Sequence, residues 1–496
     1  MINWAVIALY LLAMLSVGMY SFKRIRSLSS FYVGDRSGGT LLITGSLMAS
    51  VVGGSSTLGI AGLGFSRGLV GAWWMLVGAA GLLILSFWLS EKVRSLEVYT
   101  LPEILQSQYG SDLAKVISSV LIAVAWFGVI AAQIIAAGKI LTVLWPLELP
   151  WTMVTVGTVM VAYTALGGQY SILKTDLIQF VIILAGIVIC LVSAAAATGS
   201  LSSMAAGLPP GHFSFPVSPS FSFRDLLLFF LFVGSVFVVG PDIYSRLFCA
   251  RTPRIARRAS LITACIMIPL AFAIAFLGVS ARFLLPDIAP ESAFPALIMH
   301  LLPAGLNALV MAALLAAIMS SADTCLLTIG TIIVNDVIRP LLPARTPEKT
   351  LVLLSRTAVL VIGALSIIIA LRGQGIIGSL LFAYTIYSGG LVVPVLFGFY
   401  RDALRLHSLG AVSAVLSGGG MSAFLKLAGH EDLLILSFPV SAAFLFAGSV
   451  LGRKLGGRER NIPPGRPVGS EADEMPQDGP DGPGDEPPGL SRLLEP

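Results

Sequence analysis

Four small or hydroxyl-bearing residues share one face of the apolar segment 304–334. They recur at i, i+3, i+4 and i+7, which is one side of an α-helix, and they are Ala317, Ser320, Ser321 and Thr324. Hydroxyl and carbonyl oxygens are the ligands that hard cations prefer. Sodium is such a cation, so this face predicts a sodium site. The alternative is that each hydroxyl only bonds to the preceding turn of its own helix.

Two carboxylates lie within apolar segments, where an ionisable side chain is a functional hypothesis by default. Asp323 adjoins the hydroxyl face, and Asp176 lies near the start of the segment 172–198. Together with Thr324 they are the candidates for a second cation site or a proton site. Alternatively, Asp176 pairs with the nearby Lys174 close to the membrane interface.

Two apolar segments carry interruptions that could position such a site. The segment 40–65 contains Gly53-Gly54 followed by three hydroxyl residues, and the segment 225–249 contains Gly234-Ser235 and Gly240-Pro241. Glycine lets a membrane helix unwind, and the freed backbone groups then need partners such as an ion or a substrate. Paired interruptions in two inverted halves are the best sequence pointer to a transporter binding site. The alternative is that these small residues only permit close helix packing.

The composition indicates a bundle of membrane helices around these segments. The 496 residues are 56% hydrophobic and 11% charged, against about 45–50% and about 25% in soluble proteins. An ordinary soluble enzyme, a disordered protein and a disulfide scaffold are therefore excluded. A bilayer core needs about 20 apolar residues per helix. The thirteen predicted spans are approximately 2–22, 40–65, 69–90, 113–144, 149–166, 172–198, 225–249, 258–281, 304–334, 351–371, 375–400, 407–428 and 432–452.

Basic residues gather in alternate loops between these spans. Examples are Lys23, Arg24 and Arg26 after the first span, and the cluster from Arg251 to Arg258 after the seventh. The positive-inside rule therefore places the N-terminus outside and the C-terminus in the cytoplasm, in a multi-pass protein of the plasma (inner) membrane. Juxtamembrane charge explains the arginine cluster better than nucleic-acid binding, so no nucleic-acid partner is expected.

The chain is predicted to consist of a transmembrane domain at 1–455 and a tail at 456–496. Inverted repeats are expected at approximately 40–198 and 225–400. Residues 461–496 hold eight acidic residues, two arginines and nine prolines, so the tail is predicted to be disordered and cytoplasmic. Without those residues the net charge rises from +5 to +11, with 29 basic against 18 acidic residues.

Several separated motifs resemble the sodium/solute symporter family. They are Tyr163 with Gly167-Gly168, Thr175-Asp176 with Gln179, Gly240 to Ala250, Ala317 to Asp323, and Tyr387 to Pro394. The resemblance covers roughly residues 1–455 and leaves the acidic tail outside. It implies an all-α integral membrane protein with a LeuT-type fold. That fold is a 5+5 inverted repeat, here with one extra N-terminal helix and two extra C-terminal helices.

The resemblance also implies which residues bind cations. The sodium site uses backbone carbonyls and two hydroxyls, at positions that are here Ala49, Val52, Ala317, Ser320 and Ser321. Some members have a further cation site, at positions that are here Asp176, Ser320, Asp323 and Thr324. Members that bind a second sodium tend to have a hydroxyl where this chain has Asp323. The resemblance therefore leaves open whether this further site takes sodium or a proton.

A solute pocket is expected near the membrane midplane, beside the two interruptions. Its candidate lining combines aromatic surface with a few hydrogen-bonding groups, as small-molecule pockets do, and comprises Ser55, Ser56, Trp74, Trp126, Gln133, Phe237 and Tyr384. Each aromatic residue could instead pack against lipid or at the interface. The sequence shows no mid-membrane arginine to clamp a carboxylate, which favours a neutral or zwitterionic solute.

The favoured function is sodium-coupled symport, which imports a small organic solute through the lipid bilayer by alternating access. Sodium is expected as the coupling ion, and no organic cofactor is expected. A proton-coupled symporter of the same fold or, less readily, an ion-conducting channel is the alternative. An enzyme is not expected because the four histidines lie in or beside loops without metal-ligand spacing. The solute, the stoichiometry and the oligomeric state are not predicted.

Overall fold

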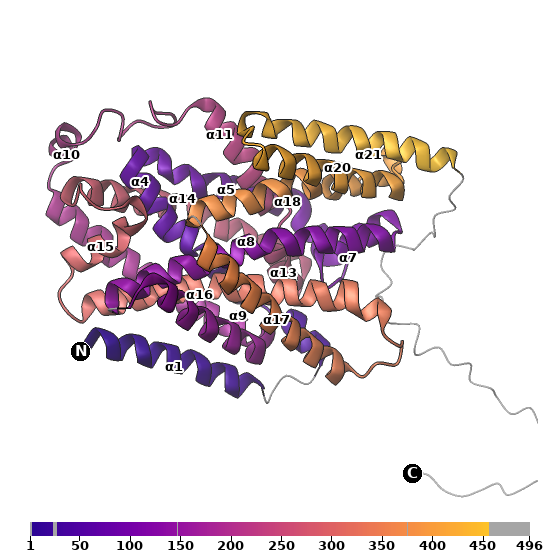
Figure 1. Ribbon diagram of the computed structural model, residues 1–496, viewed down its shortest axis with the longest axis horizontal. Coiled ribbons are helices and arrows are strands. Elements are labelled where there is room, and N and C mark those ends of the chain that lie inside the picture. Colours follow the sequence, from indigo (N-terminus) through magenta and orange to yellow (C-terminus); the bar gives the residue numbers. More distant parts are fainter. Residues whose placement is uncertain (1, 23–26, 146, 374, 456–496) are drawn as a thin grey trace, which may run out of the picture.

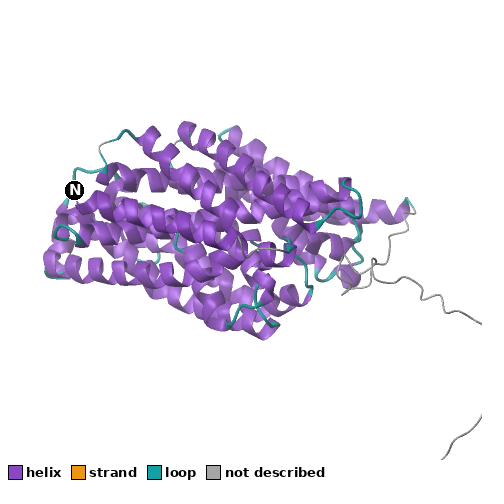
Figure 2. Ribbon diagram, turned by 90° about the horizontal axis from the view of Figure 1, so that it is seen from below, coloured by secondary structure: helices purple, strands orange, loops and turns teal. Residues whose placement is uncertain are grey.

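The computed structural model describes residues 2–22, 27–145, 147–373 and 375–455. Across these ranges the chain is helical, with short connections and no β-strand (Figure 2). The predicted tail at 456–496 and the basic residues Lys23, Arg24 and Arg26 lie outside the described residues. Most of the long helices run along the long axis of the molecule (Figure 1). The prediction of an all-helical membrane protein is confirmed.

The bundle is built from α1 (Ile2–Phe22), α3 (Thr40–Val51), α4 (Ile60–Arg67), α5 (Trp73–Ile84), α8 (Asp112–Leu144), α9 (Leu149–Thr198), α11 (Phe223–Phe229), α12 (Ser235–Val238), α13 (Pro241–Phe248), α14 (Pro253–Leu284), α16 (Leu306–Ile332), α17 (Glu348–Arg372), α18 (Ile376–Gly398), α20 (Ser408–Leu427) and α21 (Ser437–Lys454). The shorter connecting helices are α2 (Leu28–Val33), α6 (Ser90–Ser95), α7 (Leu101–Tyr109), α10 (Leu201–Gly207), α15 (Ala293–Leu301) and α19 (Arg401–Leu404).

Eleven helical stretches of the described residues are long and apolar enough to cross a membrane. The predicted count of thirteen is not confirmed, for two local reasons. The first is that α3 contributes only the shorter apolar stretch Thr40–Val51, whereas α1 is a helix of 21 residues, Ile2–Phe22. The second is that Ser55–Ser95 counts as one stretch, although its backbone leaves the helical conformation at Gly68, where φ is +82°. The end of α3 at Val51 and the continuity of Ser55–Ser95 therefore both lower the count.

The longest helix, α9, contains two predicted spans, 149–166 and 172–198. Its 50 residues would extend about 75 Å in a straight line, far beyond a hydrocarbon core of about 30 Å. The helix is kinked at Gly168, whose φ of 54° lies in the left-handed region that glycine adopts without strain. The glycine pair predicted as a motif therefore separates the two spans.

The first predicted interruption lies at Gly53-Gly54. The helix α3 ends at Val51, and the chain becomes helical again in a π-helical turn, Ser55–Gly59, that leads into α4. A Cβ on Gly53 would lie 2.5 Å from the Oγ of Ser321. The glycine is therefore required by the close approach of α16.

The second interruption is shorter than the sequence suggested. The pair Gly234-Ser235 stays helical, at the junction of a π-helical turn and α12. The helix instead ends before Val239 and Gly240, and α13 begins at Pro241. Proline suits a first helical position because its missing N–H has no intrahelical acceptor there.

The helix α16 lies at the centre of the bundle. The most apolar 18-residue segment of this part of the chain is 94% buried. The helix packs against α1, α3, α8, α9 and α17. The helices α20 and α21 pack against each other and against α18 at the edge (Figure 1). Because α16 is enclosed on all these sides, its hydroxyl face contacts protein rather than lipid.

Candidate cation and solute site

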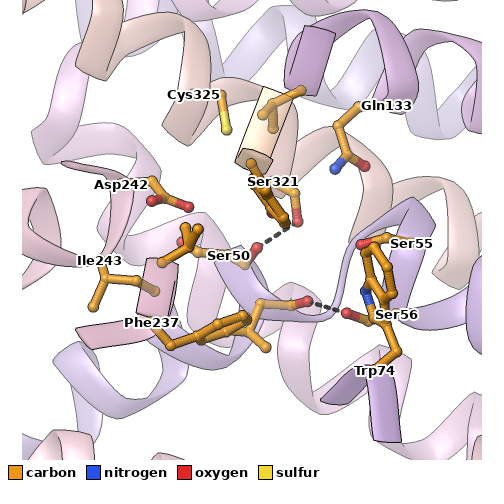
Figure 3. Close-up of a pocket in the computed structure, with 14 residues that line it drawn as sticks. Ser50, Ser55, Ser56, Trp74, Gln133, Phe237, Asp242, Ile243, Ser321 and Cys325 are labelled. Atoms are coloured by element: carbon orange, nitrogen blue, oxygen red, sulfur yellow. Dashed lines mark hydrogen bonds between the residues drawn. The ribbon is translucent and has the colours of Figure 1, made fainter. Parts of the chain in front are cut away.

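The candidate cation site forms where α16 passes the interrupted end of α3. The Ser320 hydroxyl oxygen lies 2.9 Å from the carbonyl oxygen of Ala49 and 2.8 Å from that of Ala317. The Ser321 hydroxyl oxygen lies 3.1 Å from the Ala49 carbonyl oxygen and 2.8 Å from that of Ser50 (Figure 3). Both hydroxyls therefore bond to their own helix, as isolated serines do, and also across to α3.

The five residues predicted for sodium are all buried in this region. Four of them supply the oxygens just described, and the Ser50 carbonyl is an addition that the helical spacing did not suggest. Val52 lies at the interruption, and no hydrogen bond among the described residues joins its carbonyl to Ser320 or Ser321. The candidate ligands for a cation are all uncharged oxygens. Such a set suits a hard monovalent cation better than a transition metal.

A buried ion pair lies beside this cluster. Nη2 of Arg246 on α13 is 3.2 Å from Oδ2 of Asp176 on α9, and both side chains are 0% exposed. The same guanidinium lies 3.1 Å from the Ser50 hydroxyl and bonds to Thr324. Arg246 is therefore a fully buried arginine within the predicted span 225–249, and it pairs with Asp176. Lys174, the alternative partner of Asp176, has an exposed side chain.

The two buried carboxylates are held by different partners. Oδ1 of Asp323 accepts a hydrogen bond of 2.8 Å from Thr164 on α9. Asp176 instead accepts from Ser46 on α3 and from Arg246. The structure thus divides the residues predicted for a second cation or proton site: Asp176 and Thr324 both contact the arginine, and Asp323 faces α9.

A narrow cavity of about 30 Å³ lies between the two interrupted helices (Figure 3). Its lining is Ser50, Val51, Ser55, Ser56, Trp74, Val129, Gln133, Val236, Phe237, Asp242, Ile243, Ser321, Cys325 and Tyr384. Apolar walls with a small number of polar groups are typical of small-molecule sites. The cavity also adjoins the cation cluster, since Ser50 and Ser321 belong to both.

Six of the seven residues predicted for the solute line this cavity, and Trp126 does not. Its side chain is 0% exposed. The indole ring lies 6.4 Å from the ring of Tyr384 and 4.7 Å from that of Tyr387, measured between centroids. Trp126 therefore supports the cavity wall from behind.

Polar side chains at the first interruption satisfy the freed backbone groups. Oε1 of Gln133 accepts a 2.8 Å hydrogen bond from the Gly54 amide. The hydroxyl of Ser56 donates to the Val51 carbonyl at 2.6 Å (Figure 3). These contacts explain how an unwound segment is tolerated in a membrane protein, where unpaired backbone groups are costly.

Two lining residues with reactive or charged side chains were not predicted for the solute site. Cys325 follows the predicted hydroxyl face, and Asp242 follows directly after Gly240-Pro241. Asp242 is partly buried, and its Oδ1 is buried without a hydrogen-bond partner among the described residues. Its position beside a helix interruption is the signal that could have identified it.

The chain is similar in sequence to several known proteins. The family model described as "Sodium:solute symporter family" matches residues 31–418. Sodium/myo-inositol cotransporter 2 of Bos taurus is 28% identical over 426 residues, which cover 77% of this chain and 62% of the relative. The chain therefore spans less than two thirds of that relative's length. The sodium/pantothenate symporter of Escherichia coli is 26% identical over 443 residues, 84% of this chain and 89% of the relative.

Two further proteins are similar to this chain. The high-affinity proline transporter of Bacillus subtilis is 24% identical over 452 residues, 88% of this chain and 94% of the relative. A solved sodium-coupled sialic acid symporter in a substrate-bound outward-open state superposes with a TM-score of 0.75 at 17% identity. That superposition covers 92% of this chain and 98% of the other. At that identity the structural similarity shows the fold alone.

Proposed function

This chain belongs to the sodium:solute symporter family, and on that premise we propose that it imports a small organic solute together with sodium by alternating access. The observation that carries the proposal is that the cavity and the cation cluster have two residues in common. Ser50 and Ser321 line the cavity, and their carbonyl and hydroxyl oxygens, 2.8 Å apart, belong to the cation cluster. An ion in the cluster and a solute in the cavity would act on the same interrupted end of α3.

Sodium would bind the oxygens of Ala49, Ala317, Ser320 and Ser321, with Val52 as the predicted fifth residue. Bound there, it would hold α3 against α16 and shape the wall that the solute contacts. Each ligand would then raise the affinity for the other by the same factor, because coupling between binding sites is reciprocal. The ion drives transport only through a difference in its affinity for the outward and inward forms.

We also propose the orientation given by the basic loops, with the N-terminus outside and the C-terminus in the cytoplasm of the plasma (inner) membrane. In this orientation, α13 and the part of α9 just after its kink at Gly168 lie on the cytoplasmic side of the cavity. Arg246 there contacts Asp176, Ser50 and Thr324, on three other helices. Separation of this cluster would open the path to the cytoplasm.

The domain boundaries belong to the same proposal. The transporter comprises 1–455, and its repeats at approximately 40–198 and 225–400 each begin with an interrupted helix. Coupling to protons is the alternative function, because Asp176 and Asp323 are buried carboxylates that could carry a proton. Uptake measured at fixed pH, with and without sodium, separates the two.

The test is uptake into proteoliposomes that contain the purified full chain. Radiolabelled proline, myo-inositol and pantothenate are the first solutes to try. Uptake that rises with an inward sodium gradient, and not with a potassium gradient, supports the proposal. Sodium current without stoichiometric solute flux would indicate a channel instead. Uptake that follows a pH gradient and ignores sodium would indicate proton coupling.

A further inference from the structure

The cavity carries a negative charge that the proposed mechanism does not use. Asp242 lies in the first turn of α13, and its carboxylate is on the side of the cavity where Cys325 and Ser50 lie (Figure 3). Its Oδ1 is buried and has no hydrogen-bond partner among the described residues. A buried carboxylate oxygen without a donor is costly, so a hydrogen-bond donor on a bound solute would stabilise this one.

Among the described residues, the positive charge that acts on this carboxylate is that of Arg246, which lies outside the cavity lining. Among the described residues the cavity lining contains no lysine or arginine. Arg246, one turn later on the same helix, forms its ion pair with Asp176 instead. The solute cavity therefore has a carboxylate with one buried oxygen that accepts no hydrogen bond from the described residues, whereas the neighbouring cation cluster is built from neutral oxygens.

The aromatic part of the cavity lining would also favour a positive charge. Trp74, Phe237 and Tyr384 present aromatic surface to it, and the Trp74 and Tyr384 rings are stacked with centroids 6.5 Å apart. The faces of aromatic rings attract organic cations. Ser55 and Ser56 add hydroxyl groups for a polar part of the solute.

From these features we infer that the solute carries a protonated amino group, which donates an N–H hydrogen bond to Asp242. This inference rests on the proposed function, since it takes the cavity to be the solute site. An N–H donor is required by the unpaired oxygen, which a quaternary ammonium group could not satisfy. A neutral polyol could donate a hydroxyl hydrogen, but it would leave the buried charge uncompensated. An anionic solute without an amino group would be repelled.

Equilibrium binding to the purified full chain in sodium buffer tests this inference. The probes are shape-matched pairs that differ in the amino group: proline with cyclopentanecarboxylate, 2-phenylethylamine with 2-phenylethanol, and putrescine with 1,4-butanediol. Myo-inositol and pantothenate complete the panel. A hydrogen bond to a charged group is strong enough that an amine which binds should do so at least ~10-fold more tightly than its matched compound. If no amine binds, or if only neutral or anionic probes bind, the inference is wrong.

The variant Asp242→Asn keeps the shape of the side chain and removes its charge. It should weaken binding of the preferred amine at least ~10-fold and abolish the difference within the pair. Asp242→Glu should retain the preference for the amine, with altered affinity. Asp402→Asn, on the exposed helix α19, is the matched control and should bind like the parent protein. Equal amine affinity in Asp242→Asn and the parent protein would overturn the inference.

Sodium binding by the same preparations separates this inference from the proposed function. Asp242→Asn should still bind radiolabelled sodium, which also shows that the variant is folded. Amine binding at Asp242 with uptake that ignores the sodium gradient would refute sodium coupling and leave the amine assignment intact. Sodium-driven uptake of myo-inositol that is unchanged in Asp242→Asn would support sodium coupling and refute the amine assignment.

Discussion

Replacement of Ser321 by alanine tests the cation site most directly, because this hydroxyl contacts both helices that form it. Its oxygen lies within 3.3 Å of the carbonyl oxygens of Ala49, Ser50 and Ala317. The substitution removes one oxygen ligand and leaves the backbone of α3 and α16 unchanged. Ser320→Ala removes the neighbouring ligand in the same way.

The expected size of the effect follows from two opposing contributions. A contact between a polar group and a charge is worth about 1.5–3 kcal/mol, and this is lost from the sodium-bound protein. The sodium-free protein loses a hydrogen bond worth about 1 kcal/mol, which offsets part of the difference. The sodium dissociation constant of Ser321→Ala should therefore rise roughly 3- to 30-fold. Solute affinity at saturating sodium should change less.

The assay is equilibrium binding of radiolabelled sodium to the purified protein, which does not depend on knowing the solute. Ser366→Ala is the matched control, because this buried hydroxyl on α17 has no hydrogen-bond partner among the described residues. It should bind sodium like the parent protein. Sodium dissociation constants within twofold of the parent in both Ser320→Ala and Ser321→Ala would refute the site assignment.

Three further substitutions probe the surroundings of the site. Gly53→Ala adds a Cβ that would lie 2.5 Å from the Ser321 hydroxyl oxygen, so sodium binding should weaken at least ~10-fold. Gly420→Ala is the control: its added Cβ meets no atom within 4 Å, so this variant should bind sodium like the parent protein. Arg246→Ala leaves Asp176 unpaired and should destabilise the protein by about 3–5 kcal/mol; thermal unfolding should show that the added change Asp176→Asn restores part of this loss. Trp126→Phe should leave the affinity for the transported solute within ~3-fold of the parent in a binding titration, because the ring lies behind the cavity wall. A loss of affinity much larger than ~3-fold would contradict this placement.

Several parts of the fold could be predicted because their signals are local in the sequence. The apolar runs identify the membrane helices, since each must bury its backbone polar groups internally. Gly53-Gly54 and Gly240-Pro241 indicate where two of them are interrupted, and Gly167-Gly168 where α9 is kinked. The number of spans was harder to predict, because it depends on where the helices stay continuous.

Assignment of partners between distant segments was less accurate. The sequence offered Lys174 as the neighbour of Asp176, but the partner is Arg246, which is 70 residues away in the chain. It grouped Asp323 with Thr324, although the two side chains point toward different helices. The sequence predicts Trp126 and not Asp242 in the cavity lining, whereas the structure has Asp242 and not Trp126 there.

The amino-acid sequence by itself determined that this is a helical membrane protein with two interrupted helices and an oxygen-rich face on α16. Hydropathy, glycine and proline positions, and helical spacing are properties of short segments, so they can be read without the fold. Only the tertiary structure decided that this face meets the end of α3, that an arginine neutralises Asp176, and that one buried oxygen of Asp242 has no hydrogen-bond partner among the described residues. Those outcomes depend on the rotation and contact of helices far apart in the chain, which no local pattern specifies.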